Sequence, residues 1–230
     1  MERKKAWLSW SSGKDSAWCL ETVRRQGEYD VAALLTTVNA EHKRVAMHAV
    51  RESLLQAQAE SAGLPLVTVS IPNPCPNADY EKAMAAAFEK ASAGGITHII
   101  FGDLFLEDIR RYRENQLAGT GITPVFPLWG LDTRQLASQM VGAGLRAVLT
   151  CIDPGKLDRS FAGCQFDANL LADLPNNVDP CGENGEFHTF AFRGPMFLAP
   201  IEVERGAVVE RDGFIFADVL PRQQIQFPNR

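Results

Sequence analysis

The chain has 230 residues, of which 46% are hydrophobic and 22% are charged, and its formal net charge is -5 at pH 7. This composition excludes intrinsic disorder, because the apolar content is high and the net charge is small. No apolar run approaches the roughly 18–20 residues that a bilayer requires, so we expect no membrane-spanning segment. The sequence pI of about 5.4 argues against a general nucleic-acid binder, which usually carries a basic face.

Two further features predict a cytoplasmic protein. The basic N-terminus is not followed by the apolar stretch and cleavage site of a signal peptide. The five cysteines are odd in number and form no CxxC pair, which favours reduced thiols over a disulfide framework.

Short apolar runs alternate with amphipathic stretches over the first part of the chain. In chain order we expect strands at residues 6–10, 31–38, 66–71 and 96–101, and helices at residues 16–26, 48–62, 78–93 and 106–118. Such alternation is typical of βαβ units. The sequence therefore predicts an α/β protein with a Rossmann-like parallel sheet and helices on both faces.

The second part of the chain has a different pattern. We expect a helix at 133–142, a strand at 145–152, a loop at 153–163, a short helix at 166–174 and turns over 175–186. Strands at 187–192, 198–203 and 208–219 would be antiparallel, with Asp212-Gly213 as a hairpin turn, before a tail at 223–230. A boundary near Gly130 would divide the chain into a domain at 1–130 and a smaller α+β domain at 131–230.

The segment Ser11-Ser12-Gly13-Lys14-Asp15-Ser16 lies between the first predicted strand and the first predicted helix. A helix start offers free N–H groups and a partial positive charge, which together bind anions. Gly13 would let the backbone approach a phosphate, the hydroxyls of Ser12 and Ser16 would donate hydrogen bonds, and Lys14 would supply a cation. Asp15 suits a divalent cation or a helix cap. The Walker A pattern is excluded, because it requires glycine at the place of Leu8 and Ser or Thr at the place of Asp15.

A second polar segment begins with Gly102-Asp103, directly after the fourth predicted strand and so on the same rim of the sheet. A helical period would bring Asp103, Glu107, Arg110 and Glu114 near one face and turn Ile109 away. Such a cluster suits Mg²⁺ and a substrate carboxylate. The alternative is a solvated helix joined by ion pairs four residues apart.

A third polar segment is Cys181-Gly182-Glu183-Asn184-Gly185-Glu186-Phe187-His188-Thr189. Strand alternation would place Glu186 and His188 on one face, where either is a candidate general base for an incoming amine. Two alternatives stay open for this segment: a glycine-rich turn into a hairpin, and a zinc site formed by Cys181, Glu186 and His188.

The first segment resembles the PP-loop of ATP pyrophosphatases, whose usual form is SGGxDS. With residues 102–114 and 181–189, the chain is similar to the diphthine–ammonia ligase-type PP-loop family, from Trp7 to about Phe216. Ser12 stands at the first glycine of the loop consensus, a mild departure that is tolerable if the backbone there does not adopt a positive φ.

This resemblance implies an adenine nucleotide alpha hydrolase-like fold, with ATP and Mg²⁺ bound in a cleft between the two domains. A carboxylate would attack the α-phosphorus of ATP, pyrophosphate would leave, and ammonia would convert the acyl adenylate into an amide. The implied nucleotide-binding residues are Ser11, Ser12, Gly13, Lys14, Asp15, Ser16 and Gly102, and the implied metal ligands are Asp15 and Asp103. The implied catalytic residues are Lys14, Asp103, Glu183, Glu186 and His188.

The family name implies diphthine, a modified histidine of elongation factor 2, as the substrate. Relatives with the same motifs occur in bacteria, where the acceptor must differ, so a small-molecule or a protein-borne carboxylate is expected. Two other functions are considered: sulfur transfer to RNA with Cys151 and Cys164 as reactive thiols, and a non-catalytic adenine-nucleotide sensor. A homodimer is expected on general grounds.

Overall fold

The computed structural model describes residues 2–41, 44–45 and 50–222 of the chain. The strands of its first sheet are β1 (Lys4–Ser9), β2 (Tyr29–Asn39), β3 (Arg44–Val45), β4 (Leu66–Ile71), β5 (His98–Ile100) and β6 (Thr123–Val125). The strands β2, β1, β5 and β6 lie side by side in that order, all parallel, and β4 pairs in parallel with β2. The short β3 is antiparallel to the end of β2.

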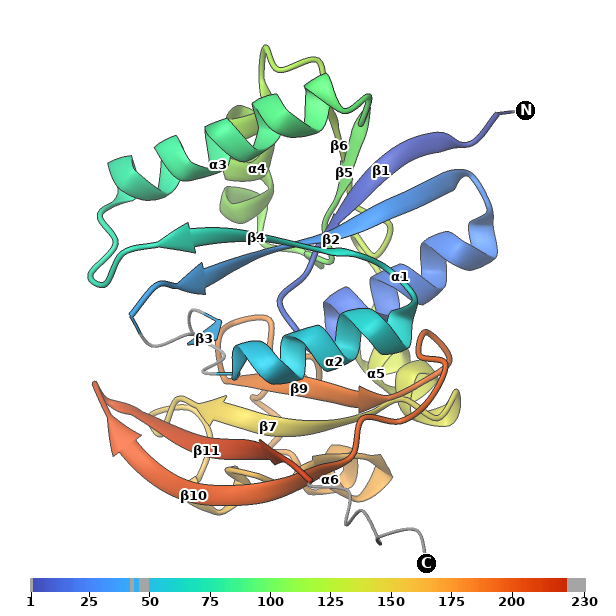
Figure 1. Cartoon of the computed structure of the whole chain (residues 1–230). Helices are drawn as coiled ribbons and strands as arrows, with labels where there is room; N and C mark the ends of the chain where they lie inside the picture. The colour runs from blue at the N-terminus through green and yellow to red at the C-terminus, as the bar shows by residue number, and fades with distance from the viewer. Residues whose placement is uncertain (1, 42–43, 46–49, 223–230) are drawn as a thin grey trace, which may run out of the picture.

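Four helices cover this sheet: α1 (Lys14–Gln26), α2 (Glu52–Ala62), α3 (Asn77–Ala93) and α4 (Glu107–Leu117). Figure 1 shows α3 and α4 on one face and α1 and α2 on the other. The buried side chains form two separate clusters accordingly, one that includes Phe88 and Ile99 and one that includes Leu8 and Leu20. The predicted α/β sheet with helices on both faces is confirmed.

The connections of the sheet change direction between β1 and β5. From β1 the chain moves through β2 to β4 on one side, and it then returns to β5 and β6 on the other side. In open α/β sheets, such a switch point leaves a crevice outside the carboxyl ends of the two strands. The loop after β1 and the loop after β5 therefore meet at this place.

The rest of the chain contains α5 (Thr133–Gly142), β7 (Arg146–Ile152), a 3-10 turn at Arg159–Phe161, β8 (Gln165–Phe166), α6 (Ala168–Asp173), β9 (Phe187–Arg193), β10 (Val203–Arg211) and β11 (Phe214–Pro221). These strands form a second, antiparallel sheet in which β7 pairs with β8, β9 and β11. The hairpin of β10 and β11 turns at Asp212 and Gly213, whose φ angles of 53° and 81° suit a two-residue turn.

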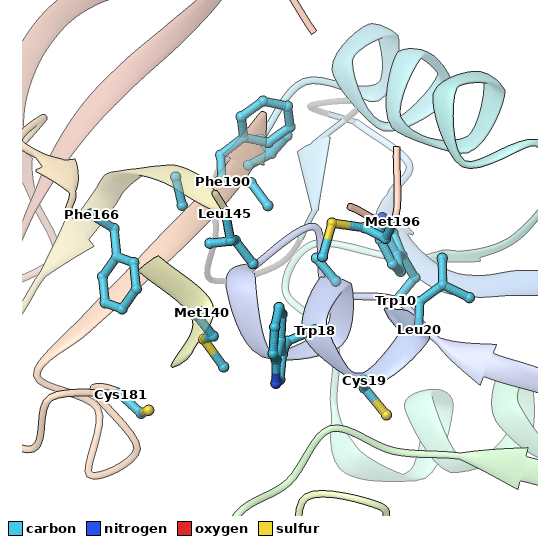
Figure 2. Close-up of a cluster of buried hydrophobic side chains, with 14 of the residues drawn as sticks. Trp10, Trp18, Cys19, Leu20, Met140, Leu145, Phe166, Cys181, Phe190 and Met196 are labelled. Carbon is cyan, nitrogen blue, oxygen red and sulfur yellow. The ribbon is translucent and has the colours of Figure 1, made fainter. Parts of the chain in front are cut away.

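The two sheets share one hydrophobic core. In Figure 1, α1 and α2 lie between the sheets, so each helix packs against both. Figure 2 shows the resulting mixture: Trp10, Trp18 and Leu20 approach Met140, Leu145 and Met196 of the later segments. The ring of Trp10 also meets that of Phe197 edge-on at 6.3 Å. Because removing one such aromatic side chain costs about 3–5 kcal/mol, this core holds the two parts together.

Several sequence predictions differ from the structure in detail. The expected strand at 198–203 is wrong: this stretch is irregular, and its N–H groups bond to separate partners, that of Leu198 to Ser61 and that of Ile201 to Phe192. The short β3 and β6 were not predicted. The predicted helix start at residues 48–49 and the tail at 223–230 lie outside the described residues.

Among the described residues, no helix combines the length and the apolar character needed to cross a bilayer. The division of the chain near Gly130 falls between β6 and α5 and stays a prediction.

Candidate active site

A cavity of about 290 Å³ opens where the carboxyl ends of β1 and β5 face the segment before β9. Each of the three polar segments of the sequence contributes to it. The lining residues are Ser9, Ser11, Lys14, Asp15, Ser16, Phe101, Gly102, Asp103, Leu106, Ile109, Arg113, Cys181, Gly182, Glu183, Gly185, Phe187, His188 and Thr189. Three of the predicted site residues, Ser12, Gly13 and Glu186, are not among them.

The first turn of α1 is tied down by hydroxyl groups. The N–H of Gly13 donates to Ser11 Oγ at 3.3 Å, and Ser16 Oγ donates to the Gly13 carbonyl at 3.0 Å. The N–H of Lys14 donates to Thr189 Oγ1 of β9 at 3.0 Å. Two of the N–H groups expected to bind an anion therefore already have side-chain partners.

Ser12 adopts a φ of 71°, so the condition under which serine would replace the consensus glycine without strain is not met. This region is unfavourable for a residue with a Cβ atom, which explains physically why the loop consensus has glycine there. The Ser12 side chain is fully buried, and its Oγ has no hydrogen-bond partner among the described residues. The Ser12 hydroxyl was expected to donate a hydrogen bond to a phosphate, but it does not reach the cavity.

Lys14 joins the loop to the third segment. Its side chain is only 2% exposed, and its Nζ donates to the Asp15 carboxylate at 2.8 Å and to the carbonyl of Cys181. The ammonium also lies 5.4 Å from the ring centroid of Phe187. Burial is the largest influence on the pKa of Lys14 and lowers it, but the acidic groups around the ammonium, with the Asp15 carboxylate first among them, together raise the pKa above its ordinary value. Lys14 is therefore a charged group whose charge Asp15 balances.

Gly102 and Asp103 form the neighbouring wall of the cavity. A Cβ atom on Gly102 would lie 3.1 Å from the backbone carbonyl of Asp15, so only glycine allows β5 to end this close to α1. Asp103 forms an ion pair with Arg113 at 3.6 Å. Burial raises the pKa of the Asp103 carboxyl, although the Arg113 guanidinium opposes the shift.

The predicted helical face of the second segment is wrong. Leu106, Ile109 and Arg113 line the cavity, whereas Glu107, Arg110 and Glu114 do not. Arg110 instead pairs with Glu114 at 2.8 Å, and its guanidinium lies over the rings of Phe126 and Trp129. Here the solvated-helix alternative, with ion pairs four residues apart, describes the structure better.

The third segment brings two groups with shifted pKa values to the cavity. Glu183 Oε1 accepts the N–H of Leu104 at 2.9 Å, and burial raises the pKa of this carboxyl to about 7. Burial, together with the nearby Lys14 charge, lowers the pKa of His188 to about 4. Near neutral pH, Glu183 is partly protonated and the imidazole of His188 is neutral.

Glu186 lies behind the cavity wall. Its Oε1 accepts the N–H of Asp179 at 3.0 Å and the Asn184 amide at 3.2 Å, so this carboxylate fixes the turn that carries Glu183. Cys181 Sγ is directed to the carbonyl of Thr133 at 3.4 Å. The groups considered for zinc therefore do not converge, and within the described residues no set of three or more His, Cys, Asp or Glu side chains is arranged to hold a metal by itself.

Sequence reasoning did not single out Phe187, Ser9 or Phe101 of the cavity, nor the buried Gln58 of α2, whose amide bonds to the Ser12 carbonyl. For Gln58 a signal exists. It shares the helical spacing of Leu54, Leu55 and Ala62, so it is a polar residue on an apolar face.

Comparisons with known proteins identify a family for both parts of the chain. A family model described as Diphthamide synthase N-terminal domain matches residues 4–122, and one described as Diphthamide synthase C-terminal domain matches residues 132–217. A curated diphthine--ammonia ligase of Danio rerio is 32% identical over 121 residues, which is 50% of this chain and 47% of that protein. The protein of the same name from Bos taurus is 30% identical over 122 residues, 50% of this chain and 45% of the relative. The one from Schizosaccharomyces pombe is 31% identical over 101 residues, 42% and 17% of the two chains.

The match thus spans about half the length of the Danio rerio and Bos taurus relatives and a smaller share of the Schizosaccharomyces pombe protein. The N-terminal family model alone covers more than half of the chain, including the loop after β1 and Gly102-Asp103. The C-terminal model covers the segment before β9. On these matches, the chain belongs to the diphthamide synthase family.

Proposed function

We propose that the chain is an ATP-dependent ligase that forms an amide from a carboxylate and ammonia and releases AMP and pyrophosphate. The curated relatives are named for diphthine and ammonia, and we propose the same substrate class for this chain. The observation that carries the proposal is one cavity at which the loop after β1, the carboxylates of Asp15 and Asp103, and the imidazole of His188 meet.

The loop after β1 would hold the phosphates of ATP. The hydroxyls of Ser11 and Ser16 lie 3.2 Å apart at the start of α1, where the helix dipole favours negative charge. Gly102 keeps the facing strand end close enough to narrow this site. As pyrophosphate leaves, these fixed donors would stabilise the charge that builds on it.

The carboxylates of Asp15 and Asp103 fit Mg²⁺, which prefers oxygen ligands and phosphate partners. Both line the cavity, and the buried Asp103 Oδ2 lies 3.6 Å from Arg113 Nε but accepts no hydrogen bond among the described residues. We propose these two residues as the metal ligands. The ion would neutralise charge on the ATP phosphates when bound.

The segment before β9 would serve the second half-reaction. An oxygen of the substrate carboxylate attacks the α-phosphorus and the bond to pyrophosphate breaks, which gives the acyl adenylate. Ammonia then attacks the acyl carbon, AMP leaves, and the nitrogen gives up a proton. Neutral His188 is the proposed acceptor of that proton, and Glu183 is the proposed group that orients the amine or shares the proton.

The cysteines do not favour the sulfur-transfer alternative. Of the two cysteines considered, Cys151 is buried, and burial raises its thiol pKa to about 12. Cys164 is half-buried, and its Sγ donates to the carbonyl of Ser160 at 3.3 Å. A nucleophilic cysteine requires a lowered pKa. The sensor alternative makes an opposite prediction, because it requires ATP binding without turnover.

The test supplies diphthine-bearing elongation factor 2, ATP, Mg²⁺ and nitrogen-15-labelled ammonium, and follows the acceptor by mass spectrometry. We expect the labelled nitrogen in an amide on the diphthine residue, with one AMP formed for each amide. ATP binding without AMP in the presence of this acceptor and of a host extract would favour the sensor. AMP formed only with the extract would retain the ligase and assign another carboxylate.

We also propose a homodimer, on the general frequency of two-fold symmetry alone. Sedimentation equilibrium of the purified chain measures this directly. The division into units at 1–130 and 131–230 is proposed as well, and limited proteolysis near Gly130 tests it.

A further inference from the structure

Gln58 of α2 is a polar side chain in the middle of the shared core, with no exposed surface. Its amide makes three hydrogen bonds to three places in the chain. Oε1 accepts the indole N–H of Trp10 at 2.8 Å. Nε2 donates to the carbonyl of Ser12 at 2.9 Å and to the carbonyl of Ala191 at 2.6 Å.

These partners matter because of where they lie. Trp10 and Ser12 flank the start of the loop after β1, and Ala191 belongs to β9, which follows the third segment of the cavity. The Ser12 carbonyl also accepts the N–H of Ala191 at 2.9 Å. The loop of the first sheet is thus bonded to the edge of the second sheet, and Gln58 bridges the same two residues from a third element.

The chemistry of the bridge requires a primary amide. The amide supplies two N–H donors and one strong acceptor, and here two carbonyls and one indole use all three. A carboxylate of the same shape would face two carbonyl oxygens without a proton. An apolar side chain of the same length would leave the buried indole N–H of Trp10 without an acceptor, and each of the two carbonyls would lose one hydrogen-bond donor.

Ser12 gives this bridge a specific task. Its φ of 71° is a conformation that residues with a Cβ atom adopt rarely, so neighbouring contacts must hold it. Its carbonyl has two donors, Ala191 and Gln58. The orientation of this peptide unit in turn sets the direction of Gly13 and of the first turn of α1, where Ser11 and Ser16 face the cavity.

We propose that Gln58 is a positioning residue for nucleotide binding. It holds the Ser12 carbonyl, and with it residues 11–16, in the orientation that presents the start of α1 to the phosphates. It also keeps this loop in register with β9, so that both walls of the cavity stay aligned. Gln58 does not line the cavity and touches no substrate. This inference rests on the proposed use of ATP.

The test compares Gln58→Met and Gln58→Glu with Gln56→Met, a matched control on the exposed face of the same helix. Equilibrium dialysis with ATP and Mg²⁺ measures the Kd, and thermal unfolding reports how much of each protein is folded. For the folded protein, we expect the ATP Kd to rise at least tenfold in Gln58→Met and further in Gln58→Glu. The Kd of Gln56→Met should stay within twofold of the wild-type value.

Variants of Gln58 that unfold at lower temperature but bind ATP with the wild-type Kd would overturn the proposal, because they would assign a purely structural role. If neither variant folds, Trp10→Phe removes the hydrogen bond to Oε1 and part of the indole ring but keeps an aromatic side chain, and we expect a two- to fivefold rise in Kd. An unchanged Kd for a folded Trp10→Phe variant would then contradict the inference.

A second measurement separates this inference from the proposed function. Native-state hydrogen exchange follows the N–H of Ala191, which donates to the Ser12 carbonyl. We expect this proton to exchange at least tenfold faster in Gln58→Met than in Gln56→Met. If the wild type fails to bind ATP, the proposed function fails. Equal exchange rates of the Ala191 proton in the two variants would overturn the role of Gln58, whatever the wild type binds.

Discussion

The two walls of the cavity handle charge in different ways. On the wall built by the first sheet, each carboxylate has a cation beside it: Asp15 pairs with Lys14 at 2.8 Å, and Asp103 pairs with Arg113 at 3.6 Å. On the wall built by the segment before β9, Glu183 and His188 respond to burial by shifting their pKa values to about 7 and about 4.

This difference indicates a division of work. Burial raises the pKa values of Asp15 and Asp103 as well, but the cation beside each carboxylate opposes that shift, and carboxylates held in this way suit the binding of a divalent cation. The shifted pKa values of Glu183 and His188 suit proton transfer, because near neutral pH each group can exist in the form that the reaction needs. The comparison therefore predicts that substitutions on the first wall abolish ATP use, whereas those on the second wall impair the amide-forming step.

The largest effect is expected at Asp103. Asp103→Asn removes a carboxylate from the proposed metal site, and we expect AMP formation to fall at least 100-fold, the order found when a fixed charge-stabilising group is lost. Asp108→Asn, on the exposed side of α4, is the control and should retain wild-type turnover. The measurement is the initial rate of AMP release at saturating acceptor. Full activity of Asp103→Asn would contradict the proposal that the first wall binds the metal ion and ATP.

A smaller effect is expected on the second wall. Glu183→Gln keeps an acceptor for the N–H of Leu104, and His188→Asn keeps a polar group, so both should fold. We expect about a 10- to 100-fold loss of amide formation, in the range of general acid–base catalysis. The ATP Kd should change less than twofold. Equal losses in ATP binding and in amide formation would show that the two walls do not divide the work.

The second wall should also leave a signature in the stability of the protein against pH. The folded pKa of His188 is about 4, and an unfolded histidine titrates near its model value of 6.5, so the unfolded state binds more protons between these values. Stability is therefore complete above about pH 6.5 and is lost as the pH falls towards 4. We expect the wild type to lose about 3 kcal/mol more than His188→Asn between pH 7 and pH 4.

Urea unfolding of both proteins across this pH range measures the difference. Parallel curves for the wild type and His188→Asn would mean that His188 titrates as an exposed histidine does. In that case burial would not lower the pKa of His188, and the proposal that it acts as a neutral base would lose its physical basis.

The smallest effect is expected at Ser12, which is buried behind the first wall and does not line the cavity. Glycine tolerates the φ of 71° and removes a buried hydroxyl that has no hydrogen-bond partner among the described residues. The greater freedom of glycine in the unfolded chain partly offsets this gain. We expect Ser12→Gly to raise the free energy of unfolding by about 0.5–1 kcal/mol and to leave the ATP Kd unchanged. A clear loss of stability would show that the Ser12 hydroxyl makes a stabilising interaction in the folded protein.

The sequence allowed the first wall to be placed well. Ser11 to Ser16 follow an apolar run and precede a helical pattern, and Gly102-Asp103 follow another apolar run. Parallel strands end at one rim, so both segments were expected to meet, and they do. The helix at Thr133–Gly142 and the strand at Leu66–Ile71 also matched the expected bounds.

Other parts of the site depended on information that no local pattern carries. The helical period was counted from Asp103, but α4 begins at Glu107 after an irregular stretch, so Ile109 faces the cavity instead of turning away. Glu186 precedes β9, so strand alternation did not fix its direction. The proposed role of Gln58 depends on its contacts with Ser12 and Ala191, which are 46 and 133 positions away from it in the sequence. Only the assembled core brings these residues together.

The most direct test of the account uses ATP labelled at the α-phosphorus, with Mg²⁺, ammonium and diphthine-bearing elongation factor 2. The account predicts that the label appears in AMP, that its formation requires the acceptor, and that Asp103→Asn abolishes it. Label recovered in ADP would mean cleavage between the β- and γ-phosphates, and this result would contradict the proposed adenylation.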